Sequence, residues 1–448
     1  MHGANERTPR LPEQPIDRLI GPLEHFMHVE AAGGIVLLAC TTLALVLANS
    51  PLSSWYLHVW ETEVGFHVGG IRVSHSLHHW INDGLMALFF FVVGLEVKRE
   101  LVLGELRDPQ RAALPIVAAV GGMLVPAGVY LAFQAGMPAQ RGWGIPMATD
   151  IAFVVGCMAV LGSRIPHGLR IMLLTLAIAD DIGAILVIAL GYSTGIHLLP
   201  LLLGAAALAL VVIVARLGVR SFGIYTLVGL VVWFDFQESG VHATIAGVIL
   251  GLLTPARPHL TGDAFAPFLR HASEPIRHED TAHERPATVR ALRQAARETI
   301  SPLEYLESTL HPWVSFVIMP VFALANAGVT LHLASFTEPV ALAVAAGLLI
   351  GKPVGILLFS WIAVRARLAR LPGGIGWPAL AGGGLLAGIG FTMALFIAGL
   401  ALDGTALDAA KVGIISGSAV SAAIGLAVLV LVLPAAPART GGHSRCPA

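Results

Sequence analysis

The chain has 448 residues, of which 56% are hydrophobic and 12% are charged, and its formal net charge is −1. Soluble globular domains usually carry about 25% charged residues, so this composition excludes an ordinary soluble protein. It predicts an all-α, polytopic membrane protein with little soluble mass, and the near-zero net charge gives no reason to expect a nucleic-acid partner.

Apolar stretches long enough to cross a lipid bilayer recur along most of the chain. A hydrocarbon core about 30 Å thick requires about 20 apolar residues per helix. By this rule the sequence predicts twelve transmembrane helices, at 31–49, 78–101, 112–134, 144–162, 168–191, 197–215, 221–235, 239–254, 308–328, 338–363, 378–400 and 411–433. The expected organisation is a tail at 1–30, spans one to eight within 31–254, a long loop at 255–307, spans nine to twelve within 308–433 and a tail at 434–448.

Lysine and arginine are distributed unequally between the two sides that these spans define. With the first residue in the cytoplasm, the inside segments hold 23 of the 27 Lys and Arg residues and the outside segments hold three. Because cytoplasmic loops carry the positive excess, this asymmetry predicts an even number of spans with both termini in the cytoplasm. The first thirty residues also lack the pattern of a signal peptide.

Two segments are expected to be non-helical. Residues 64–73 alternate around Gly69 and Gly70, which predicts an external β-hairpin, with an irregular loop as the alternative. The loop at 255–307 contains HASEPIRHEDTAHERPA, which has no apolar periodicity and is typical of a segment without fixed structure. A metal site is the alternative for its histidines, but no ligand spacing repeats there.

Among the ionisable residues of the predicted spans, five lie away from the cytoplasmic span ends in apolar surroundings, where a charge costs several kcal/mol and indicates a functional site: Asp83, Asp150, Asp180, Asp181 and Lys352. Asp180 and Asp181 are adjacent, so on a helix they point about 100° apart, and one can face a partner charge while the other faces a cavity. Two close carboxylates cannot both stay ionised at low cost, which suits a site that exchanges protons and cations. The alternative is a pair of aspartates hydrogen-bonded for packing alone.

Lys352 has about ten apolar residues on either side, which places it far from both membrane interfaces. Its ammonium could pair with an aspartate of span five or neutralise the ends of interrupted helices. A lysine that snorkels to an interface is the alternative.

Spans four and eleven carry signals for interrupted helices. In span four, Pro146 removes a backbone donor, and Thr149 and Asp150 supply oxygen atoms just beyond it. In span eleven, the segment AGGGLLAGIGFTMALF contains five glycines at 382, 383, 384, 388 and 390, each of which costs about 1 kcal/mol of helix stability relative to alanine. Broken helices at matching places in two halves of a chain indicate a binding site near the membrane midplane, although close packing through small residues explains the glycines equally well.

Seven blocks in order carry a resemblance to a known family: WINDGLMALFFFVVGLEVKRE, GWGIPMATDIAF, LAIADDIGAI, SGVHATIAGVI, LHPWV with PVFALANAGV, GLLIGKPVGI and GIGFTM. Together they resemble the NhaA family of sodium/proton antiporters over residues 33 to 434. The resemblance implies inverted-topology repeats with two interrupted helices, spans four and eleven, that cross each other. It also implies a homodimer that forms through the hairpin, in a bacterial inner membrane.

The resemblance further implies a role for each matching residue. Asp180 and Asp181 form the centre of the ion site, Thr149 and Asp150 lie at the helix crossing, and Lys352 balances the charge with Asp180 as its partner. Asp83 lies in the region through which ions enter. Positions tied to the pH response at the cytoplasmic funnel are Glu96, Arg99, Glu100, His242 and Glu307.

Without the resemblance, the residues at these pH-response positions can be interpreted as ordinary structural residues. GLEVKRE is an ordinary span terminus, and His242 is a packing histidine in an apolar helix. The loop before Glu307 is longer and richer in histidine than is usual in the family, so the pH set-point does not carry over.

The sequence therefore predicts a pH-regulated, electrogenic antiporter that exports Na⁺, and also Li⁺, in exchange for H⁺ without a cofactor. A sodium-coupled symporter is the nearest alternative, but it requires a larger, partly aromatic pocket, and aromatic residues do not cluster beside the aspartates. An intramembrane hydrolase is the alternative from another class. An aspartyl dyad normally takes its two carboxylates from different segments, however, and no HExxH or GxSxG motif is present. Sodium-driven fluorescence dequenching in everted vesicles, compared with cleavage of a peptide, separates these functions.

Overall fold

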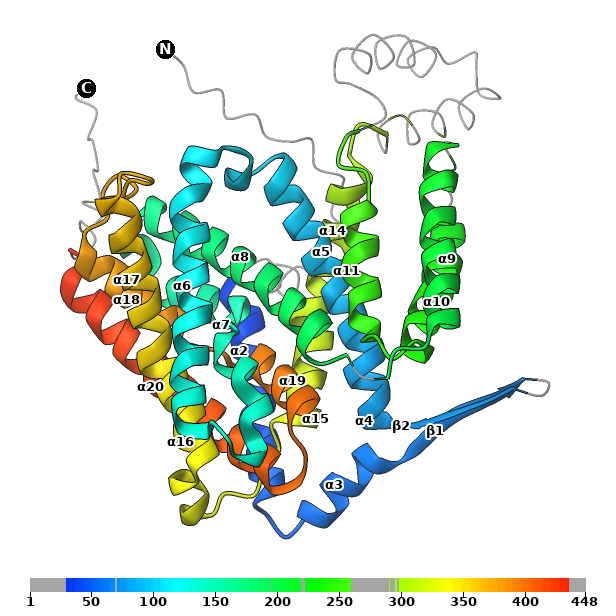
Figure 1. The fold of residues 1–448 in the computed structure, drawn as a ribbon, viewed down its shortest axis with the longest axis horizontal. Helices are drawn as coiled ribbons and strands as arrows, with labels where there is room; N and C mark the ends of the chain where they lie inside the picture. The colour runs from blue at the N-terminus through cyan, green and yellow to red at the C-terminus, as the bar shows by residue number, and fades with distance from the viewer. Residues whose placement is uncertain are drawn as a thin grey trace, which may run out of the picture.

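The computed structural model describes residues 30–434 except 69–70, 194, 218, 220–221, 259–289, 291–294 and 296–297. Figure 1 shows helices throughout, with one two-stranded hairpin that projects from the body. The first half contains α2 (Glu30–Ala48), α3 (Ser53–Glu61), β1 (Glu63–Val68), β2 (Ile71–Ser76), α4 (Leu77–His79), the π-helical η1 (Trp80–Leu85), α5 (Met86–Val102), η2 (Glu105–Arg107), α6 (Pro109–Gln134), the 3₁₀-helical η3 (Pro138–Met147), α7 (Ile151–Leu161), η4 (Gly162–Arg164), α8 (His167–Gly191) and α9 (Leu198–Arg216). The second half contains α10 (Phe222–Glu238), α11 (Ala243–Leu253), α14 (Pro302–Trp313), η6 (Val314–Ile318), α15 (Met319–Asn326), η7 (Leu333–Thr337), α16 (Pro339–Ala346), η8 (Gly347–Gly351), α17 (Lys352–Arg365), α18 (Trp377–Ala387), α19 (Phe391–Ala401) and α20 (Gly404–Val432).

Within the described residues, seven helices are long and apolar enough to cross a membrane. They are Leu77–Val102, Pro109–Gln134, His167–Gly191, Leu198–Arg216, Pro302–Asn326, Pro339–Arg365 and Gly404–Val432. Three further helix pairs pass the same test but are bent at a short break, which raises the number to ten if each pair is one span. The chain is therefore a multi-pass membrane protein, and the number of twelve crossings stays a prediction.

The first predicted span, at 31–49, corresponds to α2, but a helix that was not predicted follows it. Helix α2 ends at Ala48 and is followed by α3, which makes an angle of 114° with it. Pro51 lies in the connection and disfavours a helical conformation in the residue before it, so a single straight helix does not continue. Sequence analysis did not anticipate α3.

Capping residues explain where two of the helices begin. Asp108 accepts a hydrogen bond from the Gln110 backbone N–H, and Pro109 occupies the first position of α6. Helix α14 starts at Pro302 with a capping box between Ser301 and Glu304. The last six residues of the predicted loop at 255–307 are therefore helical, whereas the histidine-rich tract of that loop lies outside the described residues.

The predicted β-hairpin is confirmed. Strands β1 and β2 pair antiparallel in register from Glu63 with Ser76 to Val68 with Ile71. The alternative of an irregular loop is therefore wrong. The Trp80 indole donates a hydrogen bond of 2.8 Å to the Val64 carbonyl oxygen and ties the hairpin to the start of η1.

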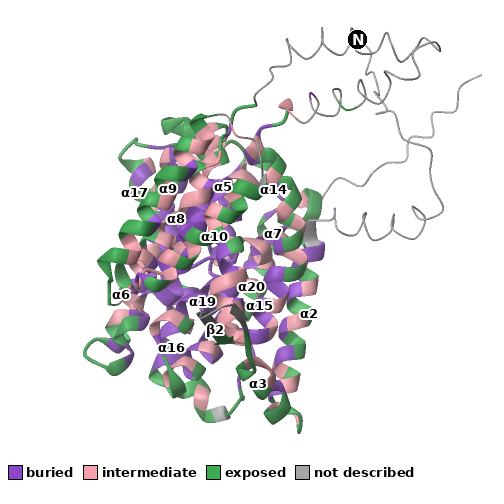
Figure 2. Ribbon diagram, turned by 90° about the vertical axis from the view of Figure 1, so that its right-hand side faces the viewer, coloured by how far each residue is buried: buried purple, intermediate pink, exposed green. Residues whose placement is uncertain are grey.

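Buried residues concentrate around the central helices, and exposed residues cover the outer surface (Figure 2). Glycines allow the inner helices to approach closely. A Cβ atom on Gly351 would lie 2.7 Å from the Pro126 Cα atom, and one on Gly94 would lie 2.6 Å from the Val248 carbonyl oxygen. These contacts hold η8 and α17 against α6, and α5 against α11.

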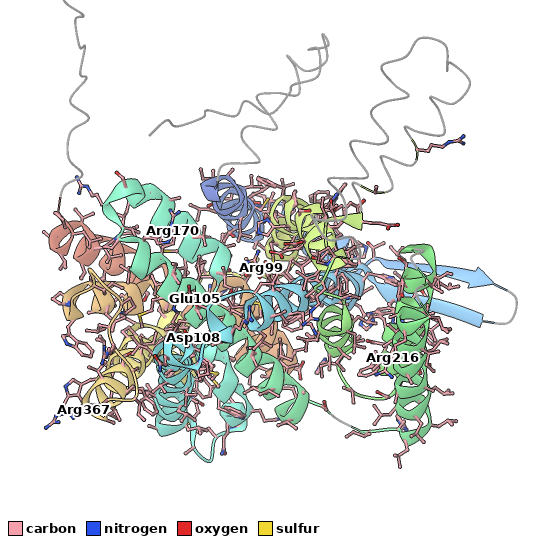
Figure 3. The ribbon with its side chains drawn as sticks, turned by 90° about the horizontal axis from the view of Figure 1, so that it is seen from above. Arg99, Glu105, Asp108, Arg170, Arg216 and Arg367 are labelled. Atoms are coloured by element: carbon pink, nitrogen blue, oxygen red, sulfur yellow. The ribbon has the colours of Figure 1, made fainter. Side chains whose placement is uncertain are left out.

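Figure 3 looks down on the molecule from the top of Figure 1 and labels arginines from several helices. Arg99 lies in the last turn of α5, Arg170 in α8, Arg216 at the end of α9 and Arg367 just after α17. The hairpin directly precedes α4, where the span formed by α4, η1 and α5 begins. Arg99 lies near the end of that span, so the hairpin and Arg99 are at opposite ends of it.

Candidate ion-binding site

Two interrupted helices lie at the centre of the candidate site. The 3₁₀ helix η3 ends at Met147, residues 148–150 are not helical, and α7 begins at Ile151 with a bend of 40° between the two helices. Helices α18 and α19 are bent by 47° at residues 388–390. Both breaks occur where Pro146 and the glycines of span eleven predicted them.

The two breaks are joined by hydrogen bonds. The Asp150 backbone N–H donates to the Ile389 carbonyl oxygen at 2.7 Å. The Asp150 side chain caps α7 by accepting from the Phe153 N–H at 3.2 Å, and its second oxygen accepts from the Thr392 N–H at 3.0 Å. The Thr392 hydroxyl donates to that same oxygen. Interrupted helices leave backbone groups without helical partners, and here each break satisfies groups of the other.

Asp180, Lys352 and Thr149 meet beside these breaks. The Lys352 ammonium donates to Asp180 Oδ2 and to the Met147 carbonyl oxygen, the last residue of η3. The Thr149 hydroxyl lies 2.6 Å from Asp180 Oδ2 and 3.0 Å from the Ala387 carbonyl oxygen. Lys352 is 0% exposed, so the alternative of a snorkelling lysine is wrong.

The two adjacent aspartates have different surroundings, as their angular separation on a helix predicts. Asp180 Oδ2 is held by Lys352 and Thr149, whereas Asp180 Oδ1 is buried without a hydrogen-bond partner in the described structure. Asp181 is 3% exposed, and no hydrogen bond or ion pair joins its carboxylate to any described residue. Charges that act on Asp181 come from Asp180, Glu96, Lys352 and Asp150. The site therefore offers buried carboxylate oxygens that a proton or a hard cation can occupy.

Four of the five residues expected at the pH-response positions gather at the far end of α5. Arg99 forms an ion pair with Glu307 of α14. Glu96 lies within electrostatic range of both, and Glu100 accepts a hydrogen bond of 2.8 Å from the Glu105 N–H.

His242 lies elsewhere, and its expected place in that cluster is corrected. It precedes α11, which packs along α5 in the same direction, with Gly247 beside Phe91 and Gly251 beside Gly94. This direction puts His242 near the start of α5, where the Asp83 charge acts on it. The pattern SGVHATIAG locates the histidine in sequence but does not reveal the direction in which α11 packs.

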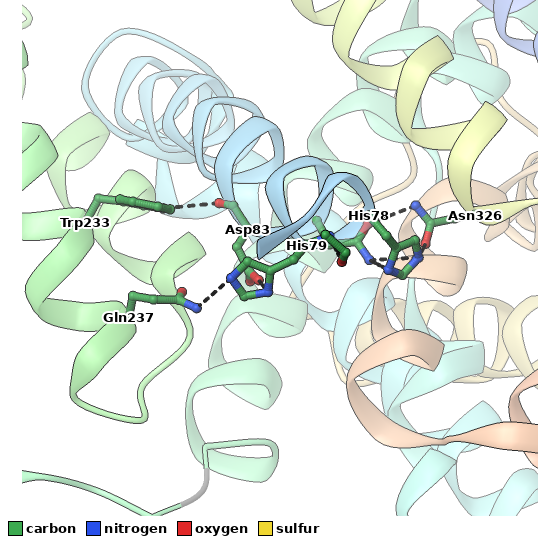
Figure 4. Close-up of polar contacts among 8 residues, drawn as sticks. His78, His79, Asp83, Trp233, Gln237 and Asn326 are labelled. Carbon is green, nitrogen blue, oxygen red and sulfur yellow. Dashed lines mark hydrogen bonds and ion pairs between the residues drawn. The ribbon is translucent and has the colours of Figure 1, made fainter. Parts of the chain in front are cut away.

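Asp83 lies in η1 with partners that sequence analysis did not identify. Asp83 Oδ2 is 3.0 Å from His79 Nδ1, and its carbonyl oxygen accepts a hydrogen bond of 3.2 Å from the Trp233 indole (Figure 4). Gln237 Nε2 lies 3.3 Å from His79 Nε2. Thr392 was likewise missed at the centre, although its position two residues after Gly390 in GIGFTM was an available signal.

A multi-pass helical protein with buried carboxylates and a lysine between two interrupted helices has the features of a secondary ion transporter. The sequence matches the family described as Na⁺/H⁺ antiporter 1 over residues 24–429. The chain therefore belongs to this family of transporters.

Individual relatives match over nearly their whole length. The Na⁺/H⁺ antiporter NhaA of Rhodopirellula baltica is 55% identical over 437 residues, which cover 97% of this chain and 99% of the relative. The Na⁺/H⁺ antiporter NhaA 2 of Acidiphilium cryptum is 51% identical over 94% of both chains. The Na⁺/H⁺ antiporter NhaA of Rhizobium meliloti is 49% identical over 96% of this chain and 98% of the relative.

Proposed function

We propose that this protein exports Na⁺, and also Li⁺, in exchange for H⁺ across a bacterial inner membrane. The observation that carries the proposal is the unequal pair of aspartates. Asp180 is bound to Lys352 and Thr149, whereas the buried carboxylate of Asp181 has no hydrogen-bond partner in the described structure. The family membership and the names of the relatives support the same two ions.

Charge counting gives the mechanism of exchange. With Asp150, Asp180 and Asp181 ionised and Lys352 protonated, the centre carries a net charge of −2. A bound Na⁺ leaves −1, whereas two bound protons leave zero. Because burial penalises residual charge, Na⁺ and H⁺ compete for the same carboxylates. The two half-cycles then carry different charge, so the exchange is electrogenic.

Alternating access follows from the proposed arrangement of the helices. Spans three to five and ten to twelve form inverted repeats within twelve crossings, and the interrupted helices of spans four and eleven cross at the ion site. Rocking of this bundle presents the site to either side. The distribution of lysine and arginine supports cytoplasmic termini, and the projecting hairpin supports a homodimer that forms through it.

Regulation by pH is assigned to the charged groups at the cytoplasmic funnel and to His242. The ion pair between Arg99 and Glu307, with Glu96 and Glu100 nearby, supports this role because none of these groups bonds directly to Asp180 or Asp181. His242 acts from the other end of α5.

The Asp181→Asn variant tests the ion site, because asparagine keeps the size of the side chain and removes its charge. We expect sodium-dependent proton movement, measured by fluorescence dequenching in everted vesicles, to vanish while the protein still inserts into the membrane. The matched control is Asp403→Asn, which changes an exposed aspartate that makes no capping hydrogen bond. Near-normal exchange by Asp181→Asn would contradict the assignment of Asp181 to the ion site.

A further inference from the structure

A polar cluster surrounds Asp83 on the hairpin side of the molecule, remote in sequence from the central aspartates (Figure 4). His79 Nδ1 and Asp83 Oδ2 are 3.0 Å apart, one helical turn from each other. The His75 ring of β2 stacks on the His79 ring with 4.2 Å between the ring centroids. The side chains of His79 and Asp83 are 32% and 17% exposed, so protein encloses the pair only in part.

We propose that His79 and Asp83 form a second proton-binding site, which takes up protons from the aqueous phase on the hairpin side. The proposal rests on the proposed function, because a transporter that exchanges H⁺ must receive protons from one aqueous phase. The site is separate from Asp180 and Asp181, with its own acceptor nitrogen and its own carboxylate.

Hydrogen bonding defines the proton state of His79. The carboxylate of Asp83 can only accept, so His79 Nδ1 carries a hydrogen and donates it. The Gln237 amide nitrogen lies 3.3 Å from Nε2 and donates to it, which requires that Nε2 carry no hydrogen. The imidazole is then neutral, and Nε2 is the atom that accepts a proton.

The Gln237 amide can form a hydrogen bond with either the neutral or the protonated imidazole of His79. When hydronium transfers a proton to Nε2, water is released and the imidazole becomes an imidazolium. A half-turn of the Gln237 amide then presents its oxygen to the new N–H. The pair passes from a charge of −1 to zero, so the Asp83 carboxylate stabilises the protonated state.

The groups that face the pair come from several elements. His75 of β2 stacks on His79, and the Asp83 charge acts on His78 of α4 and on His242, which directly precedes α11.

Hydrogen bonds and ring stacking connect the cluster to the hairpin, to α10 and to η1. Trp80 donates to the Val64 carbonyl oxygen of the hairpin and stacks on Trp233 of α10, with 6.3 Å between the ring centroids. Trp233 in turn donates to the Asp83 carbonyl oxygen in η1. Single-turn π-helical segments occur often at functional sites, and η1 carries the carboxylate of this one.

Nitrogen-15 NMR of the histidines in the full chain in detergent tests the site without reference to transport. The His79 signals are identified by their loss in His79→Gln. We expect neutral His79 to be in the Nδ1–H tautomer, and we expect Asp83→Asn to abolish this preference. An Nε2–H tautomer in the unmodified protein, or no change in Asp83→Asn, overturns the proposal.

Transport in proteoliposomes of known orientation, with pH set separately on each side, tests the use of the site. We expect His79→Gln to lose the dependence of Na⁺-driven proton flux on hairpin-side pH and to keep its dependence on the opposite pH. The matched control is His58→Gln, an exposed histidine of the neighbouring α3. Equal hairpin-side dependence in the two variants overturns the proposal. Absence of exchange in the unmodified protein refutes the proposed function instead, and the NMR result still decides the proton site.

Discussion

Lys352→Met removes the ammonium group from the buried centre and keeps a side chain of similar length. Lys352 is 0% exposed and donates to Asp180 and to the Met147 carbonyl oxygen. Removing one partner of a buried ion pair costs about 3–5 kcal/mol, because the remaining charge has lost its compensation. Asp180 keeps only the Thr149 hydroxyl as a donor, which stabilises a carboxylate less than an ammonium does. We therefore expect a loss of about 3–5 kcal/mol in the free energy of unfolding.

The measurement is unfolding of the purified protein in detergent, arranged as a double-mutant cycle with Asp180→Asn. If the ion pair accounts for the loss, Lys352→Met should cost much less when Asp180 is already neutral. Lys98→Met is the matched control, since Lys98 lies in α5 and is only partly buried. Equal cost in both backgrounds would refute the argument that the pair provides the stabilisation.

Lys352→Arg asks whether the residue balances charge or carries a transported proton. Arginine keeps a positive charge but does not release a proton in proteins. If Lys352 balances the charge of Asp180, exchange by the arginine variant remains electrogenic, and this is the result we expect. The assay is charge per turnover, measured as current on a solid-supported membrane. A change to electroneutral exchange would identify Lys352 as a proton carrier and contradict the balancing role.

Three further variants test the surroundings of the site. Glu307→Gln should shift the pH profile of transport in vesicles without abolishing the maximal rate, because Glu307 pairs with an arginine and does not bond directly to the central aspartates; an unchanged profile would contradict a role in pH response. The Tyr192 hydroxyl at the end of α8 accepts from the Gly144 N–H and donates to the Arg141 carbonyl oxygen, and both partners lie in η3. Because these bonds join η3 to α8, Tyr192→Phe should raise the KM for Na⁺ with little change in maximal rate. The control Tyr225→Phe removes a hydroxyl that donates to the nearby Val219 carbonyl oxygen, and it should leave KM unchanged. Gly94→Ala should destabilise the protein by about 1–3 kcal/mol in detergent unfolding, because its Cβ atom would meet the Val248 carbonyl oxygen at 2.6 Å. The control is Gly128→Ala, which should not destabilise the protein because a Cβ atom there has no neighbour within 4 Å among the described residues.

The residues of the central site could be predicted from sequence because lipid makes buried charge conspicuous. Asp180, Asp181 and Lys352 are visible as ionisable groups within long apolar stretches, and a membrane-embedded charge requires a partner. Pro146 and the glycines of span eleven identify the breaks because each weakens a helix by a known mechanism. Hairpin residues 64–73 alternate around a glycine pair, which is a local signal.

The remaining features depend on how distant segments pack. The position of His242 follows from the parallel packing of α11 on α5, and no local pattern around the histidine contains that direction. His79, Trp233 and Gln237 form one cluster only because α10 packs beside η1. The capping box at Ser301 and Glu304 is different, because its spacing is readable from sequence and gives the start of α14 directly.

The break in each interrupted helix can be predicted from the sequence of its own span, but the partners that stabilise the break lie in the other span. In a bilayer, backbone groups freed by a break cannot be satisfied by lipid, so a broken helix is stable only beside protein that supplies partners. Span four finds these partners in span eleven: the Asp150 N–H bonds to the Ile389 carbonyl oxygen, and Thr392 returns two donors to the Asp150 carboxylate. The Thr149 hydroxyl has one hydrogen and two acceptors within reach, Asp180 Oδ2 and the Ala387 carbonyl oxygen, so it can donate to only one of them at a time. If a proton or cation binds Asp180 Oδ2, as we propose, it competes with the Thr149 hydroxyl for that oxygen, and the hydroxyl is then free to donate to the Ala387 carbonyl oxygen at the break in span eleven.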